Sequence, residues 1–228
     1  MNKKKVMVAA IVLALVLSIG GVLAYFSDSD AATNTFTVGN ISIELTEPNW
    51  VADNAENILP NQKVAKDPTI KNDGSNPAFV FIEVAIPKKA ANAVIIENQD
   101  GTSPDPVPTD AQPLFELINS TGNVGVNSGW YLVETDTTDA SVNKYVYAYG
   151  SSTAMTSLGV NASTNPALFN EIRLANVQEG WSVESSTQNV VVTGYGIQTE
   201  GLSGVTNTAQ ANPSTVWGLL KANAVHKP

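Results

Sequence analysis

Few side chains in this sequence have the chemistry that enzymes use. The 228-residue chain has no cysteine and a single histidine, His226. A zinc peptidase needs clustered histidine and carboxylate ligands, usually as HExxH on a helix, and that motif does not occur. A Ser-His-Asp triad would have to use His226 at a chain end, where residues are usually poorly ordered. We therefore predict that the protein is not an enzyme and has no catalytic residue, metal site or cofactor.

Three aspartates, Asp100, Asp105 and Asp110, lie in an acidic, proline-rich stretch, Glu97–Pro113. Carboxylates bind calcium when their spacing matches a loop such as the EF-hand, and this spacing matches none. We therefore predict a solvated loop.

Tyr145, Tyr147 and Tyr149 alternate along one face of a predicted strand. An exposed row of tyrosines can stack on sugar rings, which would suit a binding module. The other interpretation, which we favour, is a half-buried sheet face where cross-strand pairs contribute about 0.2–1 kcal/mol each.

The N-terminus has the pattern of an export signal. Three lysines precede an apolar run, Val6–Ala24, that closes with small residues. We predict cleavage between Ala24 and Tyr25, which makes residues 1–24 a signal peptide. The alternative is an uncleaved membrane anchor, because a bilayer is spanned by roughly 20 apolar residues.

The segment that follows the predicted cut, residues 25–38, ends in a short strand pattern. Thr35, Phe36, Thr37 and Val38 alternate polar and apolar side chains. Phe36 and Val38 therefore share one face. A strand near a new N-terminus can serve for attachment to another molecule.

Gly39 separates this strand pattern from a second one, Ile41–Leu45. Side chains in a strand repeat every two residues, so the step from Val38 to Ile41 changes the face. We predict that Gly39 is a hinge that absorbs the change, and that the first piece belongs to a different sheet. The alternative is one continuous, bulged edge strand.

Alternating apolar residues predict the strands of the remaining chain. Ala78–Ile86 has the strongest pattern, with Phe79 and Phe81 on the face opposite its aliphatic residues, and is predicted to lie mid-sheet. An extended stretch at 63–71 contains Pro68, which favours a sheet edge. Further strands are predicted at Leu114–Ile118, Trp130–Glu134, Lys144–Tyr149, Glu171–Leu174 and Val190–Gln198.

Gly194 and Gly196 share one face of the last predicted strand. Glycines in a strand allow another backbone or a large ring to approach closely. They mark either an acceptor strand for a partner's strand or space for Trp130 or Trp181 of the same molecule.

The overall pattern predicts an all-β fold, a jelly-roll-like β-sandwich formed by residues 39–228 as one domain. A short helix, 213–222, follows a predicted cap at Asn212. Charged residues are only 14% and the net charge is −9. This acidity disfavours nucleic acid and anionic membrane surfaces as partners, so contact with a membrane is predicted only through the signal segment.

Four strings resemble one family, the TasA/camelysin group of secreted Gram-positive proteins. They are GGVLAYFSD (20–28), NTFTVGNISI (34–43), LPNQKVAKD (59–67) and IKNDGS (70–75). The resemblance implies processing by a SipW-type signal peptidase and a jelly-roll subunit that polymerises into extracellular biofilm-matrix fibres. The acidic loop and the C-terminal helix do not match the family's fibre former.

In that family the mature N-terminal segment completes the sheet of the next subunit. The resemblance thus implies that residues 25–38 are a donor strand anchored by Phe36 and Val38. The partner would be another copy of the chain, in a head-to-tail polymer outside the cell or on its surface. Two other functions stay open: a monomeric surface module that binds a glycan or a host protein, and a camelysin-like metallopeptidase.

Overall fold

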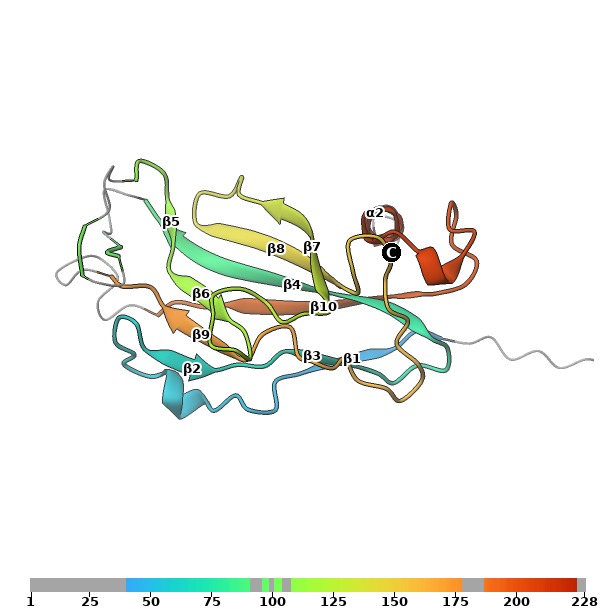
Figure 1. The fold of residues 1–228 in the computed structure, drawn as a ribbon, viewed down its shortest axis with the longest axis horizontal. Helices are drawn as coiled ribbons and strands as arrows, with labels where there is room; N and C mark the ends of the chain where they lie inside the picture. The colour runs from blue at the N-terminus through green and yellow to red at the C-terminus, as the bar shows by residue number, and fades with distance from the viewer. Residues whose placement is uncertain (1–39, 91–95, 99–100, 104–107, 178–186, 225–228) are drawn as a thin grey trace, which may run out of the picture. The chain divides into compact units, whose positions relative to one another are not determined.

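The computed structural model describes residues 40–90, 96–98, 101–103, 108–177 and 187–224 (Figure 1). The chain divides into two units, Met1–Val38 and Gly39–Pro228, and all described residues belong to the second. The predicted cleavage site Ala24/Tyr25, the predicted donor residues Thr35, Phe36, Thr37 and Val38, and the predicted hinge Gly39 lie outside the described residues.

The main sheet is antiparallel and has the order β10-β4-β8-β7. Its strands are β4 (Ala78–Lys89), β7 (Trp130–Asp136), β8 (Val142–Tyr149) and β10 (Val191–Gln198). A two-residue strand, β5 (Gln112–Pro113), pairs with the end of β4. The central place of β4 agrees with its sequence, because a strand buried on both faces needs apolar side chains on both.

Shorter strands form the opposite layer, below the main sheet in Figure 1. β2 (Lys63–Ala65), β9 (Glu171–Leu174) and β6 (Phe115–Ile118) form one antiparallel sheet. β1 (Ile43–Thr46) pairs with β3 (Thr69–Asn72). The predicted all-β sandwich is confirmed.

Two apolar clusters lie on opposite faces of β4. The inner cluster fills the space between the layers and includes Val80, Ile82 and Val84, which are fully buried. The outer cluster includes Phe79 and Phe81, which are covered by the C-terminal helix.

This helix, α2 (Pro213–Ala224), begins where the sequence predicts and extends two residues further. Asn212 Oδ1 accepts hydrogen bonds from Ser214 N (3.0 Å) and Thr215 N (3.2 Å), which caps the helix. The ring of Trp217 packs 5.2 Å from that of Phe81. Glu134 of β7 accepts hydrogen bonds from Trp217 Nε1 and from Lys221 Nζ, and this pairing lowers the pKa of Glu134. The helix is thereby fixed to the outer face of the sheet.

Two turns of 3₁₀-helix complete the described elements, η1 (Ala52–Ala55) and η2 (Thr208–Gln210). The extended stretch at 63–71 is split into β2 and β3, with Pro68 in the break. Within the described ranges, no helix has the length and apolar character needed to cross a bilayer.

Candidate functional site

The outer edge of β10 is the best candidate for an interaction site. Among the described strands β10 pairs with β4 alone, so its other edge has no strand partner. The strand has eight residues, VVTGYGIQ, without a charge, a proline or a register shift. Val191 at its start is 53% exposed. Such an edge exposes backbone donors and acceptors that can pair with another strand.

The strand at the opposite edge of the main sheet has the features that prevent such pairing. β7 contains Glu134 and Asp136, and its register with β8 shifts between Leu132 and Glu134. Charges and bulges are the usual means by which proteins protect an edge.

The edge strands of the smaller sheets are short and charged. β2 has three residues and its Lys63 forms a 3.4 Å ion pair with Glu171 of β9. β6 has four residues, and its Glu116 forms a 2.6 Å ion pair with Arg173. β1, also four residues long, contains Glu44. Of the described edges, that of β10 is therefore the longest without charge.

Gly194 and Gly196 both lie in β10, on the face that turns toward the opposite layer. A Cβ atom added at Gly194 would lie 3.3 Å from Ile70 Cδ1, and one at Gly196 would lie 2.9 Å from Ile43 Cγ2. The isoleucines of β1 and β3 therefore occupy the space that the glycines leave. The expectation that Trp130 fills it is wrong.

Trp130 packs instead against Tyr149, with 5.1 Å between the ring centroids, and the alternative Trp181 lies outside the described residues. The sequence predicted a close approach correctly but could not tell which side chains make it. A partner strand could therefore pair with the backbone edge of β10. It could not approach over the face that carries Gly194 and Gly196, because the isoleucines already occupy that space.

A turn after β3 holds the start of the described chain. Asn40 N donates to Ser75 Oγ (2.9 Å), and Ser75 N donates to Asn40 O (3.1 Å). Asp73 N donates to Ser42 O (2.9 Å). These bonds fix residues 40–42 against the turn Asp73–Ser75, at the point where the chain enters β1. Sequence reasoning identified the turn from its NDGS residues but missed this role.

The buried side chain of Asn72 stabilises that turn through hydrogen bonds. Its side chain is fully buried, and Nδ2 donates to the carbonyl oxygens of Asn76 and Leu158, both at 2.9 Å. Its Oδ1 accepts from Gly74 N at 3.0 Å. One amide thus joins the end of β3, the turn and the loop before β9.

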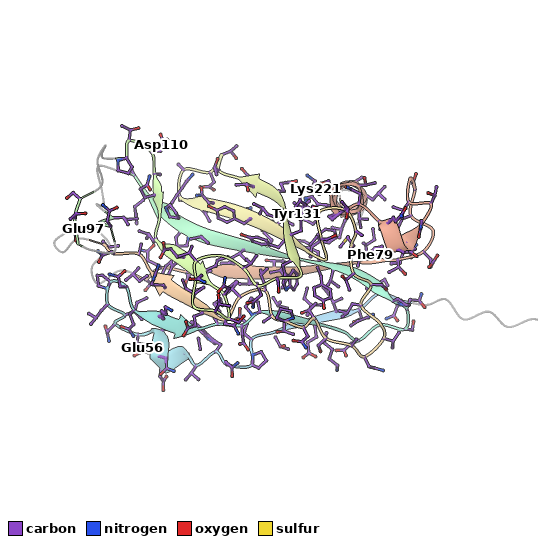
Figure 2. The ribbon with its side chains drawn as sticks, viewed as in Figure 1. Glu56, Phe79, Glu97, Asp110, Tyr131 and Lys221 are labelled. Carbon is purple, nitrogen blue, oxygen red and sulfur yellow. The ribbon has the colours of Figure 1, made fainter. Side chains whose placement is uncertain are left out.

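The tyrosine row faces the inner layer, where Tyr145, Tyr147 and Tyr149 pack against the main core. Burial raises the pKa of Tyr147 to about 12. The packing interpretation of these tyrosines is therefore the correct one. Asp110 lies at the end of the sheet away from α2 (Figure 2), and Asp100 and Asp105 lie outside the described residues.

Comparison with known families gives one match. Residues 1–89 match the model of the family described as camelysin metallo-endopeptidase. The resemblance to the TasA/camelysin group is confirmed for this part of the chain, which includes β1 to β4. No curated protein matches the chain.

The family's description implies a metal ion, which would be held by a cluster of His, Asp or Glu side chains. In the described ranges no three His, Asp or Glu side chains gather closely enough to hold one. The chain's single histidine, His226, lies outside those ranges. The described side chains do not fit a metal centre.

Proposed function

We propose, from the camelysin-family match of residues 1–89, that this chain is a secreted structural subunit that polymerises into extracellular matrix fibres. The observation that carries the proposal is the eight-residue, uncharged edge of β10, which pairs on one side only among the described strands. Soluble proteins protect such an edge unless it is used.

In the proposed assembly, residues 25–38 of one subunit add a strand to the β10 edge of the next. Backbone hydrogen bonds would supply most of this contact, as in other cases of strand addition. Phe36 and Val38 on one face of the donor would set the register. The donor and the acceptor are different surfaces, so the contact is head-to-tail, and it extends into a fibre when its rotation does not close into a ring.

Charge supports a directed contact over nonspecific association. The chain has a net charge of −9, so subunits repel one another in the absence of a specific contact. The strand pattern at residues 35–38 and β10 are both uncharged. Residues 35–38 would therefore meet β10 without a charge on either strand.

Export and assembly would follow in sequence. We propose that a SipW-type signal peptidase cuts between Ala24 and Tyr25, and that cleavage frees the donor segment. Assembly would then take place in the extracellular matrix or at the cell surface. Because Tyr145, Tyr147 and Tyr149 pack against the main core, they do not form an open row for stacking on sugar rings, which favours the fibre over a monomeric glycan-binding module.

Charges placed on β10 should block assembly. Val191→Glu with Thr193→Glu adds two carboxylates to the proposed joint, and glutamate is chosen because residues 28 and 30 of the donor segment are aspartates. If each substitution costs on the order of 1 kcal/mol at the joint, the critical concentration for fibres should rise at least about tenfold. It is measured by light scattering and electron microscopy of the chain that begins at Tyr25.

The matched control is Leu132→Glu with Thr135→Glu on β7, which adds the same charge to the other edge of the sheet. Leu132 is 42% exposed, so both pairs of substitutions should leave the fold intact. Equal critical concentrations for the two variants would show that β10 is not the acceptor.

A further inference from the structure

The hydrogen bonds of β4 show which backbone groups lie at the open edge of β10. Ala78 N donates to Leu158 O (3.0 Å), Leu158 N donates to Ala78 O (2.8 Å), and Lys88 N donates to Ser141 O (2.8 Å). All three bonds lie on the side of β4 that faces away from β10. Bonding direction alternates along an antiparallel strand, so even-numbered residues of β4 bond toward β8 and odd-numbered residues bond toward β10.

The register between β4 and β10 carries this alternation over to β10. The residues opposite the odd-numbered positions of β4 direct their N–H and C=O groups toward β4, and they are Val191, Thr193, Tyr195 and Ile197. The other residues of the strand direct these groups toward the open edge, and they are Val192, Gly194, Gly196 and Gln198. Two of the four residues that could bond an added strand are therefore glycines.

The two glycines also decide what an added strand meets on the inner face of the sheet. Gly194 and Gly196 lie opposite Ile82 and Val80, which belong to the inner cluster. Residues that lie level on neighbouring strands point to the same face of a sheet. Side chains of an added strand that lie level with the glycines would therefore point inward and meet no side chain of β10. A large side chain on a neighbouring strand stabilises such glycines by covering them.

Apolar side chains of β1 lie beneath this position. A Cβ atom at Gly196 would lie 2.9 Å from Ile43 Cγ2 and 3.4 Å from Ile41 Cγ2. Ile41, Ile43 and Leu45 pack against the main core and yet are only half-buried, whereas Ile70 of the neighbouring β3 is fully buried. β1 therefore lies beneath the margin of the main sheet, and the apolar side chains at this margin are partly uncovered.

We propose that this margin selects an extended strand with large apolar side chains at alternate positions. We call the surface the β10–β1 margin, and it consists of Val192, Gly194 and Gly196 of β10 with Ile41, Ile43 and Leu45 of β1. The backbone of β10 can bond any extended strand, and the margin adds a requirement on the side chains. The inference rests on the proposed function for the source of the strand, which is a second copy of the chain.

The chemistry of the β10–β1 margin accounts for this selection. Two inward side chains, two residues apart, would cover the glycines and the uncovered sides of the isoleucines. No side chain of the margin carries a polar atom, because all six residues are valine, glycine, isoleucine or leucine. A polar side chain at either inward position would therefore lose water without gaining a hydrogen bond from a side chain of the margin.

Two synthetic peptides of equal composition test the proposal. The phenylalanines share one face of a strand in Thr-Phe-Thr-Phe-Thr-Thr and point to opposite faces in Thr-Phe-Phe-Thr-Thr-Thr. Each peptide is added to the chain that begins at Tyr25, kept monomeric below its critical concentration, and amide exchange is followed by NMR. Binding should slow exchange at Gly194 and Gly196, whose amides face the open edge. The alternating peptide should bind at least about tenfold more tightly, because it places one more phenylalanine in the margin.

A matched pair of variants locates the selection on the inner face. Val192→Thr replaces a methyl group of the margin with a hydroxyl, so the alternating peptide should bind about three- to fourfold more weakly. Val191→Thr makes the same change on the outer face of β10, where the side chain is 53% exposed, and should leave binding unchanged. Threonine is β-branched like valine, so both variants keep the preference for a strand.

Equal binding of the two peptides, or no slowing of exchange at Gly194 and Gly196 with either, would overturn the proposal. The measurement uses monomers and needs no fibres. A chain that selects the alternating peptide but never assembles would support the selectivity of the β10–β1 margin and count against the proposed function, so the two failures can be distinguished.

Discussion

A chain that begins at Gly39 is expected to fold as the parent does and to form no fibres. All the contacts described above lie within residues 40–224, so removal of residues 25–38 takes none of them away. The shortened chain keeps the β10 edge but has no strand to donate. Size-exclusion chromatography should find a monomer at every concentration at which the chain that begins at Tyr25 forms fibres visible by electron microscopy.

The double variant Phe36→Ser, Val38→Ser tests the two apolar side chains of the donor segment separately from the length of that segment. This variant keeps the number of residues and the charge, and it should assemble poorly, because the two apolar side chains that set the register are gone. Mixing the shortened chain with the parent should give shorter fibres, since a subunit without a donor can end a polymer but not extend it. Normal fibres from the shortened chain alone would refute the proposed function.

Asn72→Ala is expected to lower the stability of the fold substantially. It leaves the carbonyl of Asn76 and the amide of Gly74 without the partner that each has now. It also removes one of two hydrogen bonds to Leu158 O, which keeps the bond from Ala78 N. Leaving a buried polar group without a hydrogen bond costs about 1–3 kcal/mol. Allowing for partial relaxation, the free energy of unfolding should fall by about 3 kcal/mol, which lowers Tm by roughly 6–12 °C for a chain of this size.

Asn54→Ala is the control for this measurement, because Asn54 is exposed in η1 and its replacement should change stability by less than about 0.5 kcal/mol. Thermal unfolding followed by circular dichroism compares the two. Equal Tm values would mean that the turn after β3 does not depend on the buried amide.

The regular elements could be predicted because each has a local signal. The aliphatic residues of β4 alternate with Phe79 and Phe81, and the structure places the two sets in different clusters. Asn212 and Pro213 marked the start of α2, and the side chain of Asn212 does cap it. Such signals need only a few neighbouring residues, so one sequence contains them.

The candidate site was harder to predict because it depends on which strands are neighbours. Gly194 and Gly196 indicated a close approach, but the side chains that fill the space come from β1 and β3, more than a hundred residues earlier. The absence of charge in VVTGYGIQ is visible in the sequence. It becomes informative only when β10 is known to be an edge strand. The buried bonds of Asn72 likewise join segments that are distant in the chain.

Disulfide trapping tests the central claim most directly, because the natural chain contains no cysteine. One chain receives a cysteine at residue 36, 37 or 38, and another receives Thr193→Cys, with Thr135→Cys on β7 as the control acceptor. Neighbouring strands bring Cα atoms within the roughly 4.4–6.8 Å that a disulfide requires. The account predicts covalent pairs between the two chains for at least one donor position with residue 193, and none with residue 135. Fibres that form without any such pair at residue 193 would contradict it.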